Sequence, residues 1–172
     1  MSNARTIMRA AVLRALEYAE RGAGEFERNN RGPDIYHFRR NDGTGGRVTG
    51  AGNWCGSFAS CCIVEASKEL MSSTPFETSR GARRLVKNAA TVGVEQMLSE
   101  ARLWAGEQGL ISWKRRGWRG HVGFITDYCP LTDTLFTVEG NHRKRGEKLA
   151  KVSTFEYPNG TWRKRLDKVV VW

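Results

Sequence analysis

The chain contains 172 residues, 40% of them hydrophobic, and carries a formal net charge of +10 at pH 7. This length suits one globular domain with a buried core, so we expect a single domain over residues 1–172. No apolar run is long enough to span a membrane, and residues 1–11 lack the apolar stretch of a signal peptide. We therefore expect no membrane span and synthesis in the cytoplasm without a secretory signal. The basic excess favours a polyanionic partner, such as nucleic acid, an anionic cell wall or anionic lipid.

The first part of the chain is predicted to be helical. Ile7, Ala11 and Leu16 recur at roughly helical spacing, and Gly22 ends the pattern. The predicted helices cover residues 6–21, 34–38, 53–71, 79–90 and 94–106.

After Gly109 the pattern changes to short alternating or β-rich runs, separated by turn residues such as Gly117 and Pro130. The predicted strands cover residues 110–113, 121–128, 134–139, 151–157 and 162–171. Helices followed by antiparallel strands indicate an α+β fold, with the helices packed on one face of the sheet.

The four cysteines, at positions 55, 61, 62 and 129, are not expected to form disulfides. Cys55 and Cys62 lie two helical turns apart, and Cys61 is adjacent to Cys62. Because no Cys-x-x-Cys pair occurs, we expect no structural zinc site. We interpret Cys61, Cys62 and Cys129 as buried reduced thiols, typical of a protein that accumulates in a reducing cytosol.

Cys55 differs from the other cysteines because it lies where a Gly-rich stretch meets a predicted helix. The unpaired N–H groups of a helix N-terminus favour a thiolate and lower the pKa of a thiol. The small Gly56 is expected to let a substrate approach closely. This position therefore predicts a nucleophilic cysteine.

A cysteine nucleophile needs a base, and the chain has three histidines. His121 begins a predicted strand between small residues that leave its ring room to reach a cleft, so it is the first choice. His142 is the second choice. His37 lies among aromatic residues with no carboxylate placed to orient it, and we interpret it as structural.

The orienting group is predicted from the strand that follows His121. A hairpin about residues 130–132 places Glu139 near Gly123 and Asn141 opposite His121, on one face of the sheet. Either side chain is expected to accept the proton of the imidazole Nδ1 and to leave Nε2 for proton transfer.

Three segments in this order resemble the CHAP family, the cysteine, histidine-dependent amidohydrolases/peptidases. They are Asn-Trp-Cys-Gly-Ser-Phe at 53–58, Gly-His-Val-Gly-Phe at 120–124 and Val-Glu-Gly-Asn at 138–141, with minor support from Asn-Arg-Gly-Pro at 30–33. The resemblance covers residues 25–141. Many relatives carry a Pro-Gly-Asp turn before the strand that precedes the histidine strand, and this chain has Gln-Gly-Leu there.

The resemblance implies a papain-like fold with Cys55 as nucleophile, His121 as base, and Glu139 with Asn141 as orienting or polarising groups. It also implies cleavage of an amide bond in peptidoglycan, by an N-acetylmuramoyl-L-alanine amidase or a peptide-bridge endopeptidase. Such an enzyme would be a phage lysin or antibacterial effector that acts at the bacterial wall after holin release or injection.

We expect the substrate contacts to include Trp54, Trp118 and Arg119, because basic and aromatic residues flank the predicted hairpin. Peptidoglycan and anionic wall polymers are the expected partners of a monomer, with nucleic acid less favoured. Some relatives bind calcium before the cysteine, but Asp42 is the one carboxylate in that loop here, so we expect no metal and no cofactor. The alternative is a catalytically silent basic module that binds cell wall or nucleic acid.

Overall fold

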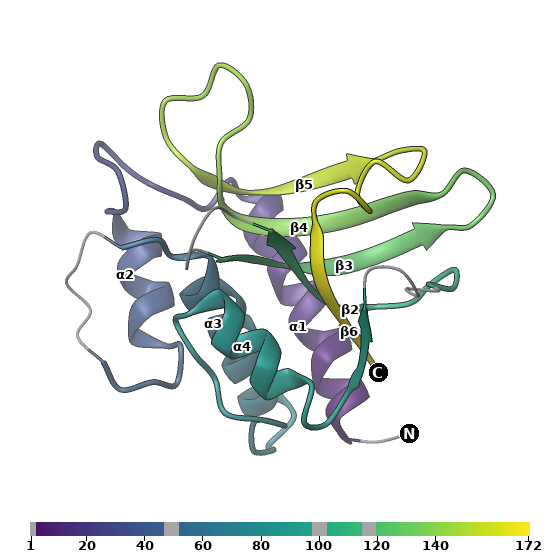
Figure 1. The fold of residues 1–172 in the computed structure, drawn as a ribbon. Coiled ribbons are helices and arrows are strands. Elements are labelled where there is room, and N and C mark those ends of the chain that lie inside the picture. Colours follow the sequence, from purple (N-terminus) through teal and green to yellow (C-terminus); the bar gives the residue numbers. More distant parts are fainter. Residues whose placement is uncertain (1–2, 47–51, 98–102, 115–119) are drawn as a thin grey trace.

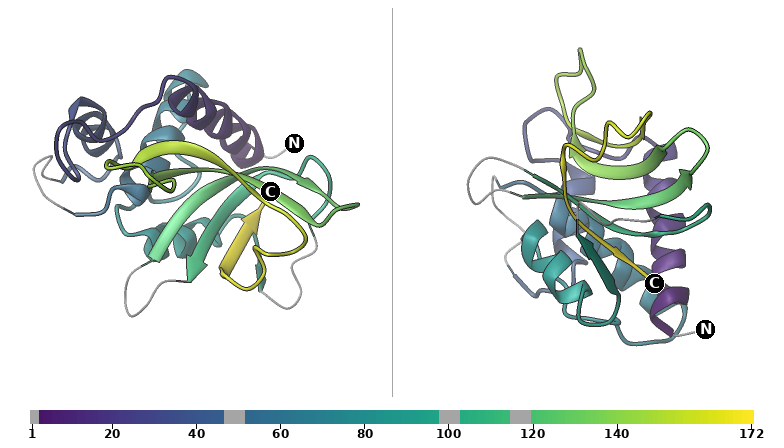
Figure 2. Two further views of the ribbon diagram at one scale, coloured as in Figure 1. Left: turned by 90° about the horizontal axis from the view of Figure 1, so that it is seen from above. Right: turned by 45° about the vertical axis from the view of Figure 1, so that its right-hand side comes forward.

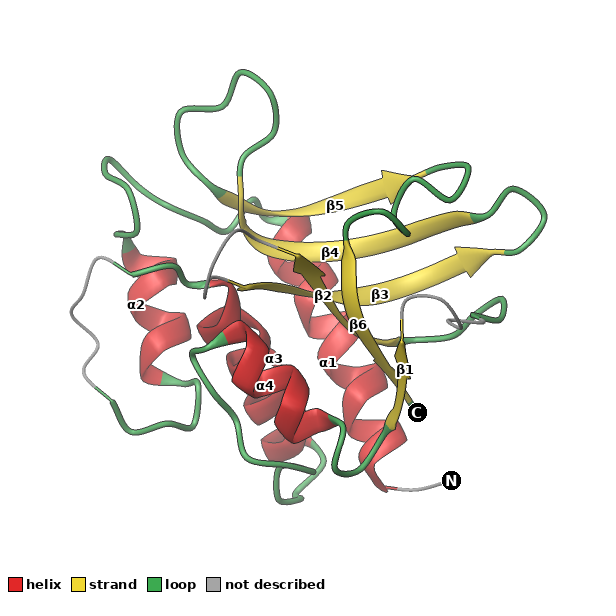
Figure 3. Ribbon diagram, in the orientation of Figure 1, coloured by secondary structure: helices red, strands yellow, loops and turns green. Residues whose placement is uncertain are grey.

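The computed structural model describes residues 3–46, 52–97, 103–114 and 120–172 (Figure 1). The helices are α1 (Asn3–Glu20), α2 (Pro33–Arg40), α3 (Cys55–Glu69) and α4 (Ala82–Ala89). The strands are β1 (Val94–Met97), β2 (Gly109–Lys114), β3 (Gly120–Cys129), β4 (Thr134–His142), β5 (Lys151–Tyr157) and β6 (Leu166–Val171). Helices precede strands, which confirms the predicted α+β class (Figure 3). Within these described ranges, no helix has the length and apolar character needed to cross a membrane.

The strands form a six-stranded sheet in the order β1-β6-β2-β3-β4-β5, and all neighbours are antiparallel. The last strand, β6, therefore lies inside the sheet between β1 and β2. In the β3–β4 hairpin, Gly123 pairs with Glu139, the register that the sequence predicts.

The helices cover one face of the sheet, with α1 and α3 in contact beneath it (Figure 2). Ile7 of α1, Phe58 of α3 and Phe124 of β3 are fully buried in one apolar cluster. The rings of Phe58 and Phe124 meet edge to face, with 6.3 Å between their centroids. This packing fixes the first turn of α3 against the start of β3.

The other face of the sheet is covered by a smaller apolar cluster around Trp162. The predicted strand 162–171 is wrong at its start, because strand β6 begins at Leu166. Trp162 instead lies in a turn, fully buried, and its indole N–H donates to Asp133 Oδ1 over 3.3 Å. A turn lets this large side chain fold back over the sheet, which an extended strand would not allow.

The predicted helix 94–106 is also wrong where the structure describes it, at residues 94–97 and 103–106; residues 98–102 lie outside the described part of the chain. Residues 94–97 form β1, which pairs with β6 from Val94 opposite Val171 to Met97 opposite Lys168. The four residues Val-Glu-Gln-Met are too few to show a decisive period, and pairing with the open edge of β6 satisfies their backbone groups.

Candidate active site

Cys55 is the first residue of α3, and its side chain is buried. Burial by itself would raise the pKa of the thiol. The hydrogen bond and positive charge of His121, together with backbone N–H groups at Val122 and Gly56, outweigh burial and hold this pKa below its ordinary value. The site therefore favours a thiolate, the nucleophilic form of cysteine.

His121, near the start of β3, is buried between Cys55 and Glu139. Its Nε2 lies 2.8 Å from Glu139 Oε2. Burial lowers the pKa of the imidazole, but hydrogen bonds with Cys55 and Glu139 and the charges of both groups raise it to about 9. A raised histidine pKa and a lowered cysteine pKa are the two signs of an imidazolium–thiolate pair.

The nitrogen assignment differs from the sequence prediction. The carboxylate engages Nε2 rather than Nδ1, so Nδ1 is the ring nitrogen left to serve the Cys55 sulfur. Glu139 rather than Asn141 holds the ring, because β4 places this glutamate directly opposite Gly123.

Glu139 is fully buried and is held by neighbouring hydroxyl groups. Thr137 Oγ1 donates to Glu139 Oε1 over 2.7 Å, and the Tyr157 hydroxyl donates to the same oxygen over 2.9 Å. Burial raises the pKa of this carboxyl, but the hydrogen bond and charge of His121 and these two hydroxyls hold it below its ordinary value. A Cβ at position 123 would lie 2.6 Å from Glu139 Cγ, so Gly123 makes room for the carboxylate arm.

A cavity of about 300 Å³ opens over the sulfur and the imidazole. Its lining residues are Asn53, Cys55, Gly120, His121, Asn141, Arg143 and Ala150. Asn141 thus belongs to the site as a wall of the cavity, at a backbone φ of 60°. The second-choice base, His142, has its ring 5.8 Å from the His121 ring and packs on Phe155.

Trp54, an expected substrate contact, is not among the residues that line the cavity. Its side chain is fully buried and stacks on Phe38 with 5.6 Å between ring centroids. Its indole N–H donates to Glu25 Oε1 over 3.3 Å. Burial of the ring anchors the residue that immediately precedes Cys55.

Glu25 is a positioning residue that sequence reasoning missed. Besides Trp54, its buried carboxylate accepts the backbone N–H of Asn30 over 2.7 Å and that of Ala150 over 2.8 Å. It therefore ties the loop before α2 and the start of β5 to the segment that presents Cys55. A lone glutamate in a polar loop gives no sequence signal for this role.

Gly56 serves packing rather than substrate approach. A Cβ there would lie 2.1 Å from the backbone oxygen of Arg80, so the segment before α4 crosses directly over the first turn of α3. The Arg80 side chain pairs with the buried Asp42 carboxylate, Nε to Oδ2, over 2.5 Å. Asp42 also accepts the backbone N–H and hydroxyl of Thr44, so this carboxylate is held by protein groups.

Two predicted substrate contacts, Trp118 and Arg119, lie outside the described residues. The interpretation of His37 needs correction, because a carboxylate does face it. Glu65 Oε1 lies 2.7 Å from His37 Nε2. The sequence separation of these residues hid the contact, which packing of α2 against α3 creates.

Comparisons of the chain with protein-family models, with characterised proteins and with solved structures return no match. The functional argument therefore rests on the geometry of this site.

Proposed function

We propose that this protein is a cysteine hydrolase that cleaves an amide bond of peptidoglycan. The observation that carries the proposal is the buried Cys55–His121–Glu139 chain beneath an open cavity. A lowered thiol pKa, a raised imidazole pKa and an orienting carboxylate are the parts that nucleophilic cysteine catalysis requires. The resemblance of three segments to the CHAP family supports the choice of substrate.

In the proposed reaction, the Cys55 thiolate attacks the amide carbonyl and forms a tetrahedral intermediate. The His121 imidazolium then donates its Nδ1 proton to the leaving amine, and the C–N bond breaks. Neutral His121 next takes a proton from water, whose oxygen attacks the thioester. The carboxylic acid product leaves and the thiolate–imidazolium pair is restored.

The negative oxygen of the intermediate needs hydrogen-bond donors. The backbone N–H of Cys55, at the N-terminus of α3, is one candidate. The side-chain amide of Asn53 is the second, because this residue lines the same cavity two positions before the nucleophile.

Arg143 gives the cavity a positive wall. Its guanidinium also donates to the Asn29 side chain, so it is held at the rim by the loop before α2. Peptidoglycan stem peptides carry free carboxylates, which a guanidinium binds in a bidentate manner. This arrangement supports an acidic peptide as the occupant of the cavity.

The decisive experiment is digestion of purified peptidoglycan, with mass spectrometry of the released fragments. The wild-type protein should release fragments with one new amine and one new carboxyl group, whose position distinguishes an amidase from an endopeptidase. Cys55→Ala should remain folded and lose at least 10³-fold in rate, since the nucleophile is absent. Cys62→Ala, which changes a fully buried thiol on the same helix, should keep activity. Equal hydrolysis by folded Cys55→Ala would refute the mechanism.

A further inference from the structure

We propose that His37, Cys61 and Glu65 form a binding site for a divalent transition metal ion, with Zn²⁺ the best match to the ligand set. The site is separate from the proposed hydrolase centre. Cys61 lies six residues beyond Cys55 on α3, which corresponds to about 9 Å along the helix axis.

The three candidate ligands converge from two packed helices. Cys61 and Glu65 are four residues apart on α3 and share one face of the helix, and His37 reaches them from α2. One atom from each, the imidazole nitrogen, the sulfur and a carboxylate oxygen, lie within 4.8 Å of one another. Nitrogen, sulfur and oxygen donors together are typical ligands of zinc.

Modest shifts of the three side chains would bring their donor atoms to the spacing of a tetrahedral site. Zinc–ligand bonds of about 2.0–2.3 Å place tetrahedral ligands roughly 3.3–3.6 Å apart. The 2.7 Å contact between His37 Nε2 and Glu65 Oε1 would open, and the sulfur would approach. The His37 side chain is 42% exposed, so its ring can turn and the ion has a path from solvent. Water would supply the fourth ligand.

Neighbouring side chains support the ligands. The Tyr18 hydroxyl lies 2.9 Å from His37 Nε2 and donates to Glu65 Oε2 over 2.9 Å, which orients the carboxylate. The side-chain amide of Asn41 lies 3.3 Å from His37 Nδ1. It is the amide nitrogen that faces Nδ1, and it also donates to the His37 carbonyl over 3.0 Å. With a metal on Nε2 the proton would reside on Nδ1, and the Asn41 amide would have to flip for its oxygen to accept this proton.

The local charge also favours a cation. Glu65 brings a carboxylate to the site, and a bound cation would stabilise the thiolate form of Cys61 beside it. Arg14 Nε lies 3.9 Å from Glu65 Oε2. The same guanidinium also pairs with Glu17 and Glu69, so its positive charge keeps two carboxylate partners if a metal binds Glu65. Metal binding breaks the Cys61 S–H bond and releases this proton to solvent.

A bound ion would crosslink α2 to α3. Asn53, which lines the cavity, lies between these two helices in the chain, and Cys55 is the first residue of α3. The ion would therefore stabilise the fold around the cavity without contacting it.

The test uses Co²⁺ as the probe, because Co²⁺ bound to thiolate gives a near-ultraviolet charge-transfer band and tetrahedral Co²⁺ gives visible bands. The starting protein is metal-free full-length Cys55→Ala, which removes the thiol of the hydrolase site as a competitor. Saturation at one ion per chain is expected, with displacement of Co²⁺ by Zn²⁺ and a Zn²⁺-dependent rise in the thermal unfolding midpoint.

Further substitutions in that background identify the ligands. Cys61→Ser should abolish the charge-transfer band, and His37→Gln, which alters an exposed side chain and leaves the core intact, should weaken binding at least tenfold. Cys62→Ser, at the adjacent buried thiol, should keep the band. A band that survives in Cys61→Ser, equal affinity in His37→Gln, or no saturable Co²⁺ binding would each overturn the proposal.

Discussion

At the scale of single residues, the hydrogen bonds of His121 with Cys55 and with Glu139 set the acid–base behaviour of the site. The imidazole pKa of about 9 means that His121 is protonated across the neutral range and loses its proton as the pH rises through 9. The lowered pKa of Cys55 means that the thiolate is lost only as the pH falls below the ordinary thiol range. Both ions are needed for the proposed reaction, so activity should be high between these two limits.

We therefore predict a bell-shaped dependence of kcat/KM on pH, with its alkaline limb near pH 9. Glu139→Gln removes one of the two charges that raise the His121 pKa, so this limb should move to lower pH. A charged hydrogen bond of about 1.5–3 kcal/mol corresponds to a shift of about one to two pH units. Hydrolysis of a soluble muropeptide measures the profile. Glu156→Gln, on the exposed side of β5, is the matched control and should leave the limb in place.

Asn53 provides a second prediction at this scale. If its amide stabilises the negative oxygen of the intermediate, Asn53→Ala should lower kcat about 10²-fold with a smaller change in KM, because that oxygen exists only after attack. Asn141→Ala should have the smaller effect on kcat, since Asn141 forms a wall of the cavity. The reverse ranking of the two variants would assign the donor role to Asn141.

At the scale of elements, the crossing of the Arg80 backbone over the first turn of α3 positions the nucleophile. Gly56→Ala would place a Cβ 2.1 Å from the Arg80 oxygen, and backbone cannot rotate away as a side chain can. Alanine has a more favourable helix propensity than glycine by about 1 kcal/mol. Overpacking against Arg80 costs about 1–3 kcal/mol and outweighs this gain, and the start of α3 must shift to relieve it. We predict a lower unfolding free energy together with loss of hydrolysis.

Chemical denaturation measures this effect, and Gly52→Ala is the matched control. No atom lies within 4 Å of a Cβ at position 52, so this variant should retain wild-type stability. Equal stability and activity of the two variants would show that the contact at Gly56 does not hold α3 in place.

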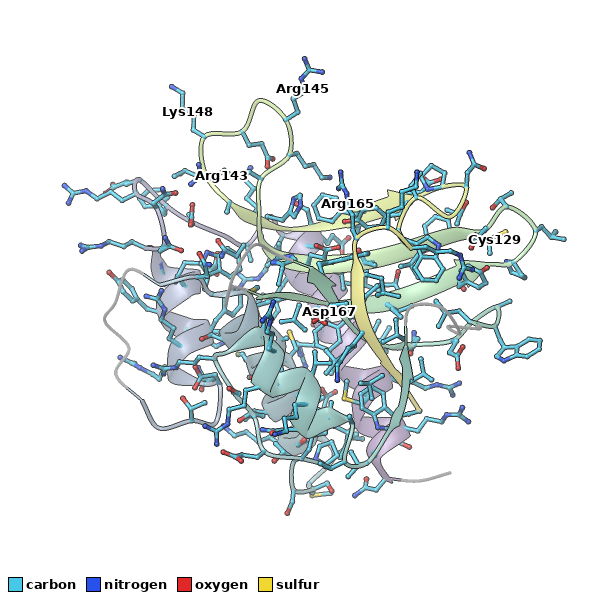
Figure 4. All side chains as sticks on the ribbon, viewed as in Figure 1. Cys129, Arg143, Arg145, Lys148, Arg165 and Asp167 are labelled. Atoms are coloured by element: carbon cyan, nitrogen blue, oxygen red, sulfur yellow. The ribbon has the colours of Figure 1, made fainter. Side chains whose placement is uncertain are left out.

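At the scale of the whole molecule, the net charge is +10, and several of the basic side chains lie together beside the cavity (Figure 4). Arg143, Arg145 and Lys148 project from the loop that joins β4 to β5 (Figure 4). This loop begins at the rim of the cavity, because Arg143 is among its lining residues. The loop is therefore well placed to attract an anionic polymer toward Cys55.

We predict that binding to purified cell wall weakens steeply as salt rises, because the Debye length falls from about 10 Å at 0.1 M to about 3 Å at 1 M. The double variant Arg145→Glu, Lys148→Glu should weaken retention on intact wall more than cleavage of a small soluble fragment. The double variant Arg9→Glu, Lys68→Glu changes the net charge equally on the exposed surfaces of α1 and α3 and should have less effect.

A sedimentation assay that compares wall with nucleic acid at matched salt completes this test. Retention of nucleic acid at physiological salt, without wall binding or wall cleavage, would favour the basic binding module over the enzyme.

The sequence by itself determined the α+β order of elements, a helix start within two residues of Cys55 and the facing of Gly123 and Glu139. These features depend on local periodicity and on a short hairpin, where near neighbours in the chain set the geometry. Only the tertiary structure decided that Glu139 rather than Asn141 engages the imidazole, and that it does so through Nε2. It also decided that Trp54 is buried on Glu25, because this contact depends on the packing of segments far apart in the chain. The strand at residues 94–97 was also decided by the tertiary structure, since its partner strand lies more than 70 residues away in the chain.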